Sequence, residues 1–466
     1  MYKVRVNGLE LFAECGRKLS DVLTENRLIV EHPCGGRGLC RKCTVRVNGR
    51  EVLSCAYVIT EDITVELPEA GDVFSIERLS DKEENASLFL CLDVGTTTLE
   101  MALVDATSNQ ILRIIKATNP QGSVGADVIS RIDFCRKNGV TYLNKLLVDK
   151  INELIKKLGV CVEKMYVAGN TTMLHTFLGE DCSSLGVAPY TPMFLEGKTA
   201  DAESVGIENV GEVECLPGIH SFVGADIVAG LNAADMPSQG KYNLLIDLGT
   251  NAELALWNAD GGICTSAAAG PCFEGANISC GMSAVSGAIS SFREGRLEVI
   301  GNTQPKGLCA TGLIDVISAL LRSGAIDKTG FMAEDFSLAY GVTLTQEDVR
   351  EYQVAKSAVL SAVKTLVREK GITFEDIQKV YISGGFSHGL NIKNAIETGL
   401  FPAELENKCS VSGNTSLLGT VRCALGRENI NDFVTGFRYI DLSQDEYFSM
   451  EFIKNMEFCV DGNRQF

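Results

Sequence analysis

Apolar runs with the length of strands alternate with amphipathic stretches with the length of helices over most of this 466-residue chain. Tyr142–Leu158 carries leucine and isoleucine at intervals of three and four residues and is followed by Gly159, which predicts a helix that ends there. Short apolar runs predict strands at Met165–Ala168 and Lys379–Ile382. This alternation is typical of an α/β fold.

The two ends of the chain have different patterns. Short alternating strands are predicted at Tyr2–Val6 and Thr44–Val47, with a helix near Leu19–Glu25. The polar, irregular stretch Pro68–Ser87 predicts a linker between this small domain and the α/β part. Near the other end, Gly413–Thr415 is expected to open the last helix of the chain, which leaves a tail without assigned elements.

One pattern occurs twice in the α/β part: an apolar strand, an Asp-x-Gly-Thr turn and a second apolar strand, at Leu90–Asp105 and Leu244–Trp257. A carboxylate can bind water-shelled Mg²⁺, and a glycine turn brings backbone N–H groups close to a ligand, so the pattern suits nucleotide phosphates. Two coincidental hairpins are the alternative. The candidate residues are Asp93, Gly95, Thr96, Thr97 and Thr98 in the first hairpin and Asp247, Gly249, Thr250 and Asn251 in the second.

Polar or glycine-rich turns also follow other predicted strands. Asn170 and Thr171 either contact a ligand or cap the next helix. Gly384 and Gly385 would let a base and a ribose lie flat on the backbone. Asp226 opens an apolar helix, where it could orient an attacking water or hydroxyl near a γ-phosphate. The alternative for Asp226 is a helix N-cap.

Four cysteines near the start, Cys34, Cys40, Cys43 and Cys55, have the spacing C-x5-C-x2-C-x11-C. Zinc sites usually show two C-x-x-C pairs, and only one is present. The plant-type [2Fe–2S] spacing is C-x4-C-x2-C with a distant fourth cysteine, one residue shorter than this loop. We therefore predict a [2Fe–2S] cluster, with zinc and plain core thiols as alternatives. Cys15 lies outside this spacing and is expected to pack in the core.

Charge and composition limit the partners. The net charge is −18, and the first 70 residues are neutral, so the remaining chain carries the excess. This argues against nucleic acid as a partner. No apolar run of 18 residues and no signal-peptide pattern is present, so we expect a cytoplasmic protein without membrane contact. Seventeen cysteines in such a protein are not expected to form disulfides, and Cys264, Cys272 and Cys280 are expected in the core.

Basic residues gather in the cysteine loop. They form either a solvated face or a docking surface for an acidic partner, or for the acidic remainder of this chain, that steers electron transfer. These residues are Arg37, Arg41, Lys42 and Arg46.

The order of these motifs resembles that of the actin, sugar-kinase and heat-shock ATPase superfamily. The resemblance implies two ribonuclease H-like lobes that bind ATP-Mg, with one phosphate hairpin from each. Asp93 and Asp247 would hold Mg²⁺ through water, and Gly384 and Gly385 would hold adenosine. Thr96, Thr97, Thr250 and Asn251 would contact the phosphates. Gln353 and Lys356 stand where the heat-shock ATPases have Glu-x-x-Lys to hold adenosine. The predicted division is a ferredoxin-like β-grasp domain at 1–68, a linker at 69–87, lobes at 88–240 and 241–425, and a tail at 426–466.

With the N-terminal loop PCGGRGLCRKC, the chain is similar to a narrower family, the ATP-dependent reductive activators of corrinoid proteins. The blocks AGNTTMLHTFLG, FVGAD, IDLGTNAELAL, AAAGPCFEGANI and ISGGF also resemble that family. Arg41 stands where the family commonly has glycine, and there is little room for the extra middle domain of larger members.

This narrower resemblance implies ATP hydrolysis coupled to one-electron reduction of a Co(II) corrinoid protein. The cofactors would be a [2Fe–2S] cluster, ATP and Mg²⁺, with an upstream reductant that the sequence does not identify. A homodimer is an expected assembly. Two alternatives stay open. One is a small-molecule kinase with a regulatory cluster, which would use Asp226 as general base; the other is a nucleotide-binding scaffold without enzymatic activity.

Overall fold

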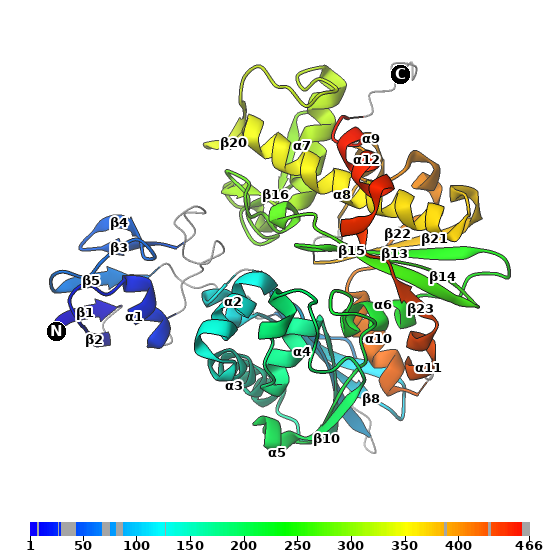
Figure 1. The fold of residues 1–466 in the computed structure, drawn as a ribbon. Coiled ribbons are helices and arrows are strands. Elements are labelled where there is room, and N and C mark those ends of the chain that lie inside the picture. The colour runs from blue at the N-terminus through cyan, green and yellow to red at the C-terminus, as the bar shows by residue number, and fades with distance from the viewer. Residues whose placement is uncertain are drawn as a thin grey trace. The chain divides into compact units, whose positions relative to one another are not determined.

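The computed structural model describes residues 1–6, 9–26, 28, 43–67, 75–80, 87–125, 127–385, 389–426 and 430–458 (Figure 1). The chain divides into two compact units. Unit 1 comprises Met1–Asp226 and Thr420–Arg427, and unit 2 comprises Ile227–Gly419 and Glu428–Phe466.

The N-terminal part of unit 1 is a small sheet with one helix against it, the predicted β-grasp arrangement. The strand order is β2-β1-β5-β3-β4, with β1 parallel to β5. Alternate side chains of β1 and β3, such as Val4 and Val45, are buried with Leu19 and Leu23 of α1. The elements are β1 (Tyr2–Val6), β2 (Leu9–Ala13), α1 (Leu19–Glu25), β3 (Thr44–Val47), β4 (Arg50–Leu53) and β5 (Ile63–Glu66). The strands predicted at 2–6 and 44–47 and the helix are thereby confirmed.

The rest of unit 1 is built on a seven-stranded sheet of order β11-β12-β10-β7-β8-β9-β6. Its strands are β6 (Ser75–Arg78), β7 (Leu88–Val94), β8 (Thr98–Asp105), β9 (Gln110–Thr118), β10 (Val162–Gly169), β11 (Lys198–Asp201) and β12 (Val210–Cys215). Its helices are α2 (Val128–Asn138), α3 (Thr141–Leu158), α4 (Thr171–Leu178) and α5 (Ala202–Val205), and α6 (Ala225–Ala233) begins at its end. β6 lies within the stretch predicted as a linker, where it pairs with β9 at the edge of the sheet.

Unit 2 contains a six-stranded sheet of order β22-β21-β13-β14-β15-β23. Its strands are β13 (Tyr242–Leu248), β14 (Ala252–Asn258), β15 (Gly261–Ala267), β21 (Ile377–Ser383), β22 (Cys409–Val411) and β23 (Phe437–Tyr439). β13 is antiparallel to β14 and parallel to β21, as β7 is antiparallel to β8 and parallel to β10 in unit 1. The two units therefore share one core topology, which agrees with the predicted pair of ribonuclease H-like lobes.

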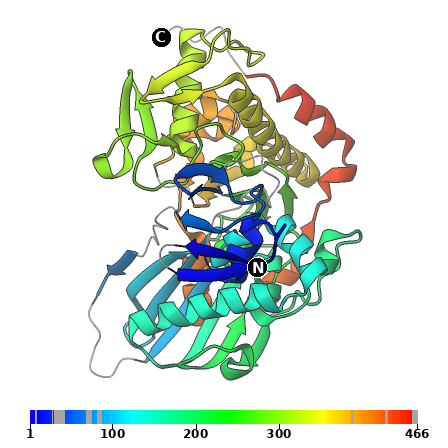
Figure 2. The same ribbon diagram turned by 90° about the vertical axis from the view of Figure 1, so that its left-hand side faces the viewer.

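Unit 2 also carries helices and small sheets outside this core. They are β16 (Ala288–Arg293), β17 (Arg296–Val299), β18 (Gly307–Leu308), α7 (Ala310–Ser323), β19 (Phe336–Ala339), β20 (Val342–Leu344), α8 (Gln346–Lys370), α9 (Ile392–Glu397), α11 (Ile430–Thr435) and α12 (Glu446–Lys454). α10 (Thr415–Ala424) begins in unit 2 and ends in unit 1. α8 packs on β14 and β15, and α12 (red) runs beside α8 (yellow) in both views (Figure 1, Figure 2).

Local signals account for the helices that the sequence predicts. α3 ends at Gly159, whose φ of 66° is a left-handed conformation that glycine adopts readily. The helix predicted after Gly413 is α10, but it is not the last one. α11 and α12 follow, and Ile440, Leu442 and Phe458, which lie between or after them, are buried in the core of unit 2.

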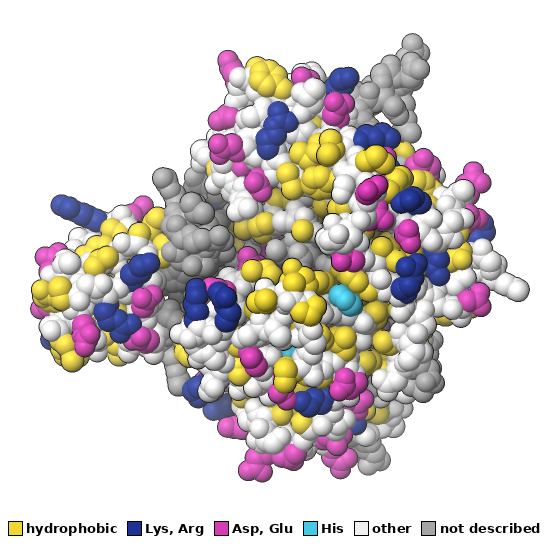
Figure 3. Space-filling view, in the orientation of Figure 1, with side chains coloured by type: hydrophobic (Ala, Val, Ile, Leu, Met, Phe, Trp, Pro, Cys, Tyr) yellow, Lys and Arg dark blue, Asp and Glu magenta, His cyan; other side chains and the backbone are white. Residues whose placement is uncertain are grey.

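Three expectations drawn from the sequence concern the charge of the surface, membrane-spanning helices and the burial of Cys15. On the face seen in Figure 3, Lys and Arg side chains are interspersed with Asp and Glu, and the described residues form no continuous basic surface there. None of the helices in the described ranges combines the length and the apolar content needed to span a bilayer. Cys15 is exposed, so the expectation that it packs in the core is wrong.

Candidate functional site

The first hairpin, between β7 and β8, turns through Gly95. The Gly95 N–H donates to the Thr98 carbonyl oxygen at 3.0 Å, and a Cβ atom on Gly95 would lie 2.6 Å from that oxygen. Asp93 is half-buried near the end of β7, opposite Glu100 of β8. Thr97 and Thr98 are exposed. The turn therefore needs glycine at 95 and presents two threonines to solvent beside a carboxylate-bearing strand end.

Asn170 joins the first hairpin to the start of α4. Its Oδ1 accepts a hydrogen bond from the Met173 N–H at 3.0 Å, which makes Asn170 the N-cap of α4. Its Nδ2 donates to Thr96 Oγ1 at 3.0 Å. Thr171, the next residue, is buried, and its hydroxyl donates to the carbonyl of His220 at 3.3 Å. Asn170 thus has the capping role that was one alternative, and at the same time contacts the predicted phosphate turn.

Asp226 lies just after Gly224, whose backbone packs closely against the start of α4. A Cβ atom on Gly224 would lie 2.6 Å from the Cα of Asn170, so the chain entering α6 is in contact with the start of α4. α6 begins at Ala225, which makes Asp226 its second residue and not the capping residue before it. The carboxylate is half-buried.

The first turn has features that fit an anionic ligand. In the part of the chain that the structure describes, the amides of Thr96 and Thr97 donate to no protein acceptor. Backbone N–H groups without an internal partner on a turn are the groups that bind phosphate oxygens. The donor set and the neighbouring Asp93 are therefore compatible with a magnesium-bound phosphate.

The second hairpin, between β13 and β14, also turns through a glycine, but its loop is one residue shorter and its side-chain contacts differ. The Gly249 N–H donates to the Asn251 carbonyl at 2.9 Å. The Thr250 hydroxyl donates to Oε2 of Glu274 at 3.0 Å. Asp247 accepts a 2.6 Å hydrogen bond from the Ser383 hydroxyl. Burial raises the pKa of Asp247 above the ordinary value for aspartate, and the hydrogen bond from Ser383 acts in the opposite direction.

Gly384 and Gly385 follow β21 in unit 2 and have different surroundings. Gly384 has φ of 109°, and a Cβ atom there would overlap the carbonyl oxygen of Leu248. Among the described residues, a Cβ atom on Gly385 would meet no atom within 4 Å. Gly384 therefore fits β21 against the end of β13, whereas Gly385 leaves open backbone next to it.

Gln353 and Lys356 have partners in the C-terminal segment. Lys356 is fully buried, and its Nζ donates to the carbonyls of Asn455 (2.6 Å) and Glu457 (2.5 Å). Gln353 Nε2 donates to the carbonyl of Met456 at 2.6 Å. The structure thus gives both side chains a role in holding residues 455–457 on α8. The adenosine contact predicted for them stays a prediction that depends on the resemblance alone.

Two of the four predicted cluster ligands lie side by side. The Sγ atoms of Cys43 and Cys55 are 3.2 Å apart, and both residues are buried. This separation is far longer than a disulfide bond. Two sulfurs bound to one tetrahedral metal at about 2.3 Å lie about 3.8 Å apart, so this pair would have to separate by about 0.6 Å to share one iron. The predicted ligands Cys34 and Cys40 lie outside the described residues, as do Arg37, Arg41 and Lys42.

Cys264, Cys272 and Cys280 are the later cysteines that were expected in the core. Cys264 and Cys272 are buried, as predicted, and burial raises the pKa of Cys264 to about 12. Cys280 is half-buried. Among the described residues, no group of three or more Cys, His, Asp or Glu side chains is arranged to hold a metal ion.

Four residues at these turns were not given a role by the sequence pattern: Asn119, Arg131, Glu274 and Ser383. Asn119 Nδ2 donates to the carbonyl of Gly95 at 2.8 Å, and Arg131 is almost completely buried behind the same turn. The position of Arg131 four residues before Cys135 places both on the buried face of α2, but nothing in the local sequence assigns Arg131 to the turn. Ser383 directly precedes the glycine pair in the sequence, but parallel pairing with β13 is what brings it to Asp247.

Three family models match consecutive parts of the chain. Residues 4–71 match the 2Fe-2S iron-sulfur cluster binding domain. Residues 88–239 match the RACo middle region, and residues 241–466 match the C-terminal domain of RACo, the ASKHA domain. The chain therefore has a [2Fe–2S]-binding domain followed by an actin-like, sugar-kinase-like part.

Similar proteins cover nearly the whole chain. The corrinoid activation enzyme RamQ of Eubacterium limosum is 27% identical, with 94% of this chain and 96% of the relative covered. The [Co(II) methylated amine-specific corrinoid protein] reductase of Methanosarcina barkeri is 27% identical over 79% of this chain and 76% of the relative. A solved structure, the reductive activator for corrinoid,iron-sulfur protein, is 27% identical and matches 98% of both chains with a TM-score of 0.71. Because two consecutive RACo models and this chain-length structural match agree, the chain belongs to the RACo family, the reductive activators of corrinoid proteins.

Proposed function

We propose that this protein uses ATP-Mg to drive the transfer of one electron from a [2Fe–2S] cluster to the Co(II) corrinoid of a partner protein. Two relatives are named for corrinoid activation and for reduction of a Co(II) corrinoid protein, which supports this assignment. The observation that carries it is the sulfur pair of Cys43 and Cys55, present in the same chain as two Asp-x-Gly-Thr hairpins.

The cluster would be held by Cys34, Cys40, Cys43 and Cys55, and when bound it supplies one electron at a time. The buried pair, Cys43 and Cys55, keeps two thiolates away from water. Thiolate ligation and shielding from solvent both affect the reduction potential of such a centre. The N-terminal domain therefore provides the electron carrier.

ATP-Mg would be bound by the residues at the two hairpins and the turns that follow neighbouring strands. Asp93 and Asp247 would hold Mg²⁺ through water, and Asp226 would orient the attacking water. The phosphates would be bound by Gly95, Thr96, Thr97, Thr98, Asn170, Thr171, Gly249, Thr250 and Asn251. Adenosine would lie against Gly384 and Gly385, with Gln353 and Lys356 assigned to it by resemblance only.

The reaction balances as a one-electron exchange. The reduced cluster loses one electron while the cobalt of the corrinoid substrate goes from Co(II) to Co(I), and an upstream reductant then restores the cluster. For a one-electron step, each 59 mV uphill lowers the equilibrium constant tenfold. A nucleotide can offset such a deficit only if its bound states differ in affinity for the partner. Coupling to ATP therefore requires binding and release of the corrinoid protein to depend on the nucleotide.

The test follows Co(I) formation. Anaerobic protein with a chemically reduced cluster is mixed with a purified corrinoid protein in the Co(II) state, with and without ATP-Mg, while the Co(I) absorbance is recorded. We expect Co(I) to accumulate at least tenfold faster with ATP-Mg. Equal rates in both samples would contradict the coupling.

A substitution in the second hairpin connects this result to the site. Asp247→Asn removes the carboxylate charge and should abolish the effect of ATP while leaving the visible spectrum of the cluster intact. Asp260→Asn, in the exposed turn after β14, is the matched control and should behave as the unsubstituted protein. An Asp247→Asn protein with full ATP dependence would remove Asp247 from the site.

A further inference from the structure

The side chain of Arg131 contacts three segments: the Thr96 turn, residues 121–125 and, with Nη1 3.2 Å from its sulfur, Met173 of α4. Nη2 donates to the Thr96 carbonyl at 2.6 Å, Nε donates to the Gly125 carbonyl at 2.9 Å, and Nη1 donates to Oε1 of Gln121 at 3.2 Å. Only 1% of the residue is exposed. A buried guanidinium with its donors fixed in a planar fork can define the position of a backbone carbonyl closely.

The carbonyl oxygens of Gly95, Thr96 and Thr97 in the turn each accept a hydrogen bond from Arg131 or Asn119. Asn119 Nδ2 donates to the Gly95 carbonyl and the Asn119 N–H donates to the Thr97 carbonyl, both at 2.8 Å. In a planar trans peptide the C=O of one residue and the N–H of the next point in opposite directions. Arg131 holds the Thr96 carbonyl and therefore directs the Thr97 N–H away from the Arg131 side chain. Asn119 holds the Gly95 carbonyl and directs the Thr96 N–H away from the Asn119 side chain.

Neither of these two amides donates to a protein acceptor among the described residues. We propose that Arg131 is a positioning residue for the nucleotide, which acts through the Thr96–Thr97 peptide to hold the phosphate-binding amides in place. This inference rests on the proposed binding of ATP and adds a residue that does not itself touch the nucleotide. It requires that Arg131 affect the binding of phosphate groups and not of the nucleoside.

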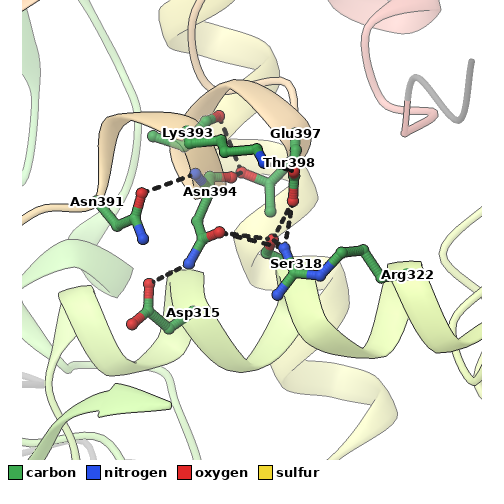
Figure 4. A network of polar contacts seen from close by, with 9 residues as sticks. Asp315, Ser318, Arg322, Asn391, Lys393, Asn394, Glu397 and Thr398 are labelled. Atoms are coloured by element: carbon green, nitrogen blue, oxygen red, sulfur yellow. Dashed lines mark hydrogen bonds and ion pairs between the residues drawn. The ribbon is translucent and has the colours of Figure 1, made fainter. Parts of the chain in front are cut away.

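A purely structural role makes a different prediction, and Arg322 provides the comparison. Arg322 of α7 donates to Ser318 Oγ at 2.7 Å and to Oδ1 of Asn394 at 3.2 Å, and it pairs with Glu397 of α9 (Figure 4). The three contacts come from Nη1 of a partly exposed side chain, and they connect helices of unit 2 that carry no predicted phosphate ligand. Loss of Arg322 should lower stability without changing how strongly phosphates are bound.

The experiment measures dissociation constants of ADP-Mg and of adenosine for the full-length protein and for Arg131→Met, Arg131→Lys and Arg322→Met. The readout is the ratio of the adenosine constant to the ADP constant, measured below the unfolding transition of every variant. We expect Arg131→Met to lower this ratio about 10- to 100-fold, as expected for displaced binding groups. Arg131→Lys should also lower it, because an ammonium cannot serve three separated acceptors. Arg322→Met should leave it within twofold.

The outcomes separate this inference from the proposed function. If the unsubstituted protein binds no ADP, the proposed function fails. If it binds ADP and the Arg131→Met ratio is unchanged, or Arg131→Lys restores the full ratio, the positioning role is wrong. Should Arg131→Met fail to fold, Arg131→Lys decides by the same ratio, since it keeps the positive charge in the core.

Discussion

The Ser383 hydroxyl donates a 2.6 Å hydrogen bond to Oδ2 of Asp247, and the two residues lie opposite each other on the parallel strands β21 and β13. Burial raises the pKa of Asp247 above its ordinary value of 3.8, and this hydrogen bond lowers it. Ser383 therefore stabilises the ionised carboxylate that Mg²⁺ would need.

Replacing Ser383 should shift the pH dependence of the protein. When the folded-state pKa of a carboxyl is raised, the folded protein holds that proton to higher pH, so Mg²⁺ binding is lost as pH falls through the raised pKa. Ser383→Ala removes the stabilising donor and raises the pKa further. The acidic limb of kcat/KM for ATP hydrolysis should move to higher pH by about 1–2 units, since a hydrogen bond to a charged group contributes about 1.5–3 kcal/mol.

The same shift has a consequence for stability. Because the folded state binds the proton more tightly, the free energy of unfolding contributed by Asp247 falls as pH rises between 3.8 and the folded pKa. Because Ser383→Ala raises the folded-state pKa further, the pH range over which this stability is lost should extend to higher pH. Ser412→Ala, with a half-buried hydroxyl that donates to the Ser410 carbonyl, is the control. Identical profiles for both variants would show that Ser383 does not affect the carboxylate.

The cysteine pair gives a prediction about iron. Cys43→Ser and Cys55→Ser should each lose at least half of the bound iron and the visible absorbance, because the thiolate supplies a ligand that a hydroxyl replaces poorly. The controls are Cys15→Ser and Cys161→Ser, whose residues are exposed and outside the predicted spacing. Iron per chain and the absorbance spectrum measure the result, and ADP affinity should stay within twofold in all four variants. Undiminished iron in Cys43→Ser would contradict the ligand assignment.

The neighbouring glycines after β21 should respond differently to a single methyl group. Gly384→Ala places a Cβ atom at φ of 109° against the Leu248 carbonyl, which costs about 1–3 kcal/mol of strain and lowers the unfolding temperature by about 3–10 °C. Because a Cβ atom on Gly385 would meet none of the described residues, the stability of Gly385→Ala should be unchanged. If adenosine lies on this backbone, Gly385→Ala should weaken ATP binding at least fivefold. Thermal unfolding and a nucleotide titration give the two answers, and unchanged ATP affinity would move the adenosine site elsewhere.

Features set by residues close together in the sequence could be predicted, and contacts between residues far apart in the sequence could not. The α3 stop at Gly159 and both glycine turns are encoded within a few residues, so the pattern located them. Arg131 contacts Thr96 across 35 positions and lies on a helix without a wide apolar stripe, so no local pattern assigned it to the turn. β23 has three residues and obtains its partners by pairing with β15, which explains why the stretch around it was predicted as a tail.

Lys356 is the clearest example of such a long-range role, and its replacement supplies a last prediction. Its Nζ donates to the carbonyls of Asn455 and Glu457 and lies 4.8 Å from the centre of the Phe458 ring. Lys356→Met keeps the length of the side chain but leaves these buried carbonyls without their donor, at a cost of about 2–4 kcal/mol. The unfolding temperature should fall by about 5–10 °C, and chymotrypsin should cleave at Phe458 under conditions that spare the unsubstituted protein.

A matched variant and a binding measurement separate the two roles assigned to this lysine. Lys393→Met, at a side chain that is 66% exposed, should leave both the unfolding temperature and the cleavage pattern unchanged. Adenosine affinity is then measured at a temperature where Lys356→Met is still folded. A loss confined to stability means that Lys356 serves only to hold the C-terminal segment, because its donors are already directed at that segment's carbonyls. A tenfold loss of adenosine affinity in addition means that the side chain also contributes to the nucleoside site, as the resemblance to the heat-shock ATPases implies. Unchanged stability would contradict the structural role derived from its burial.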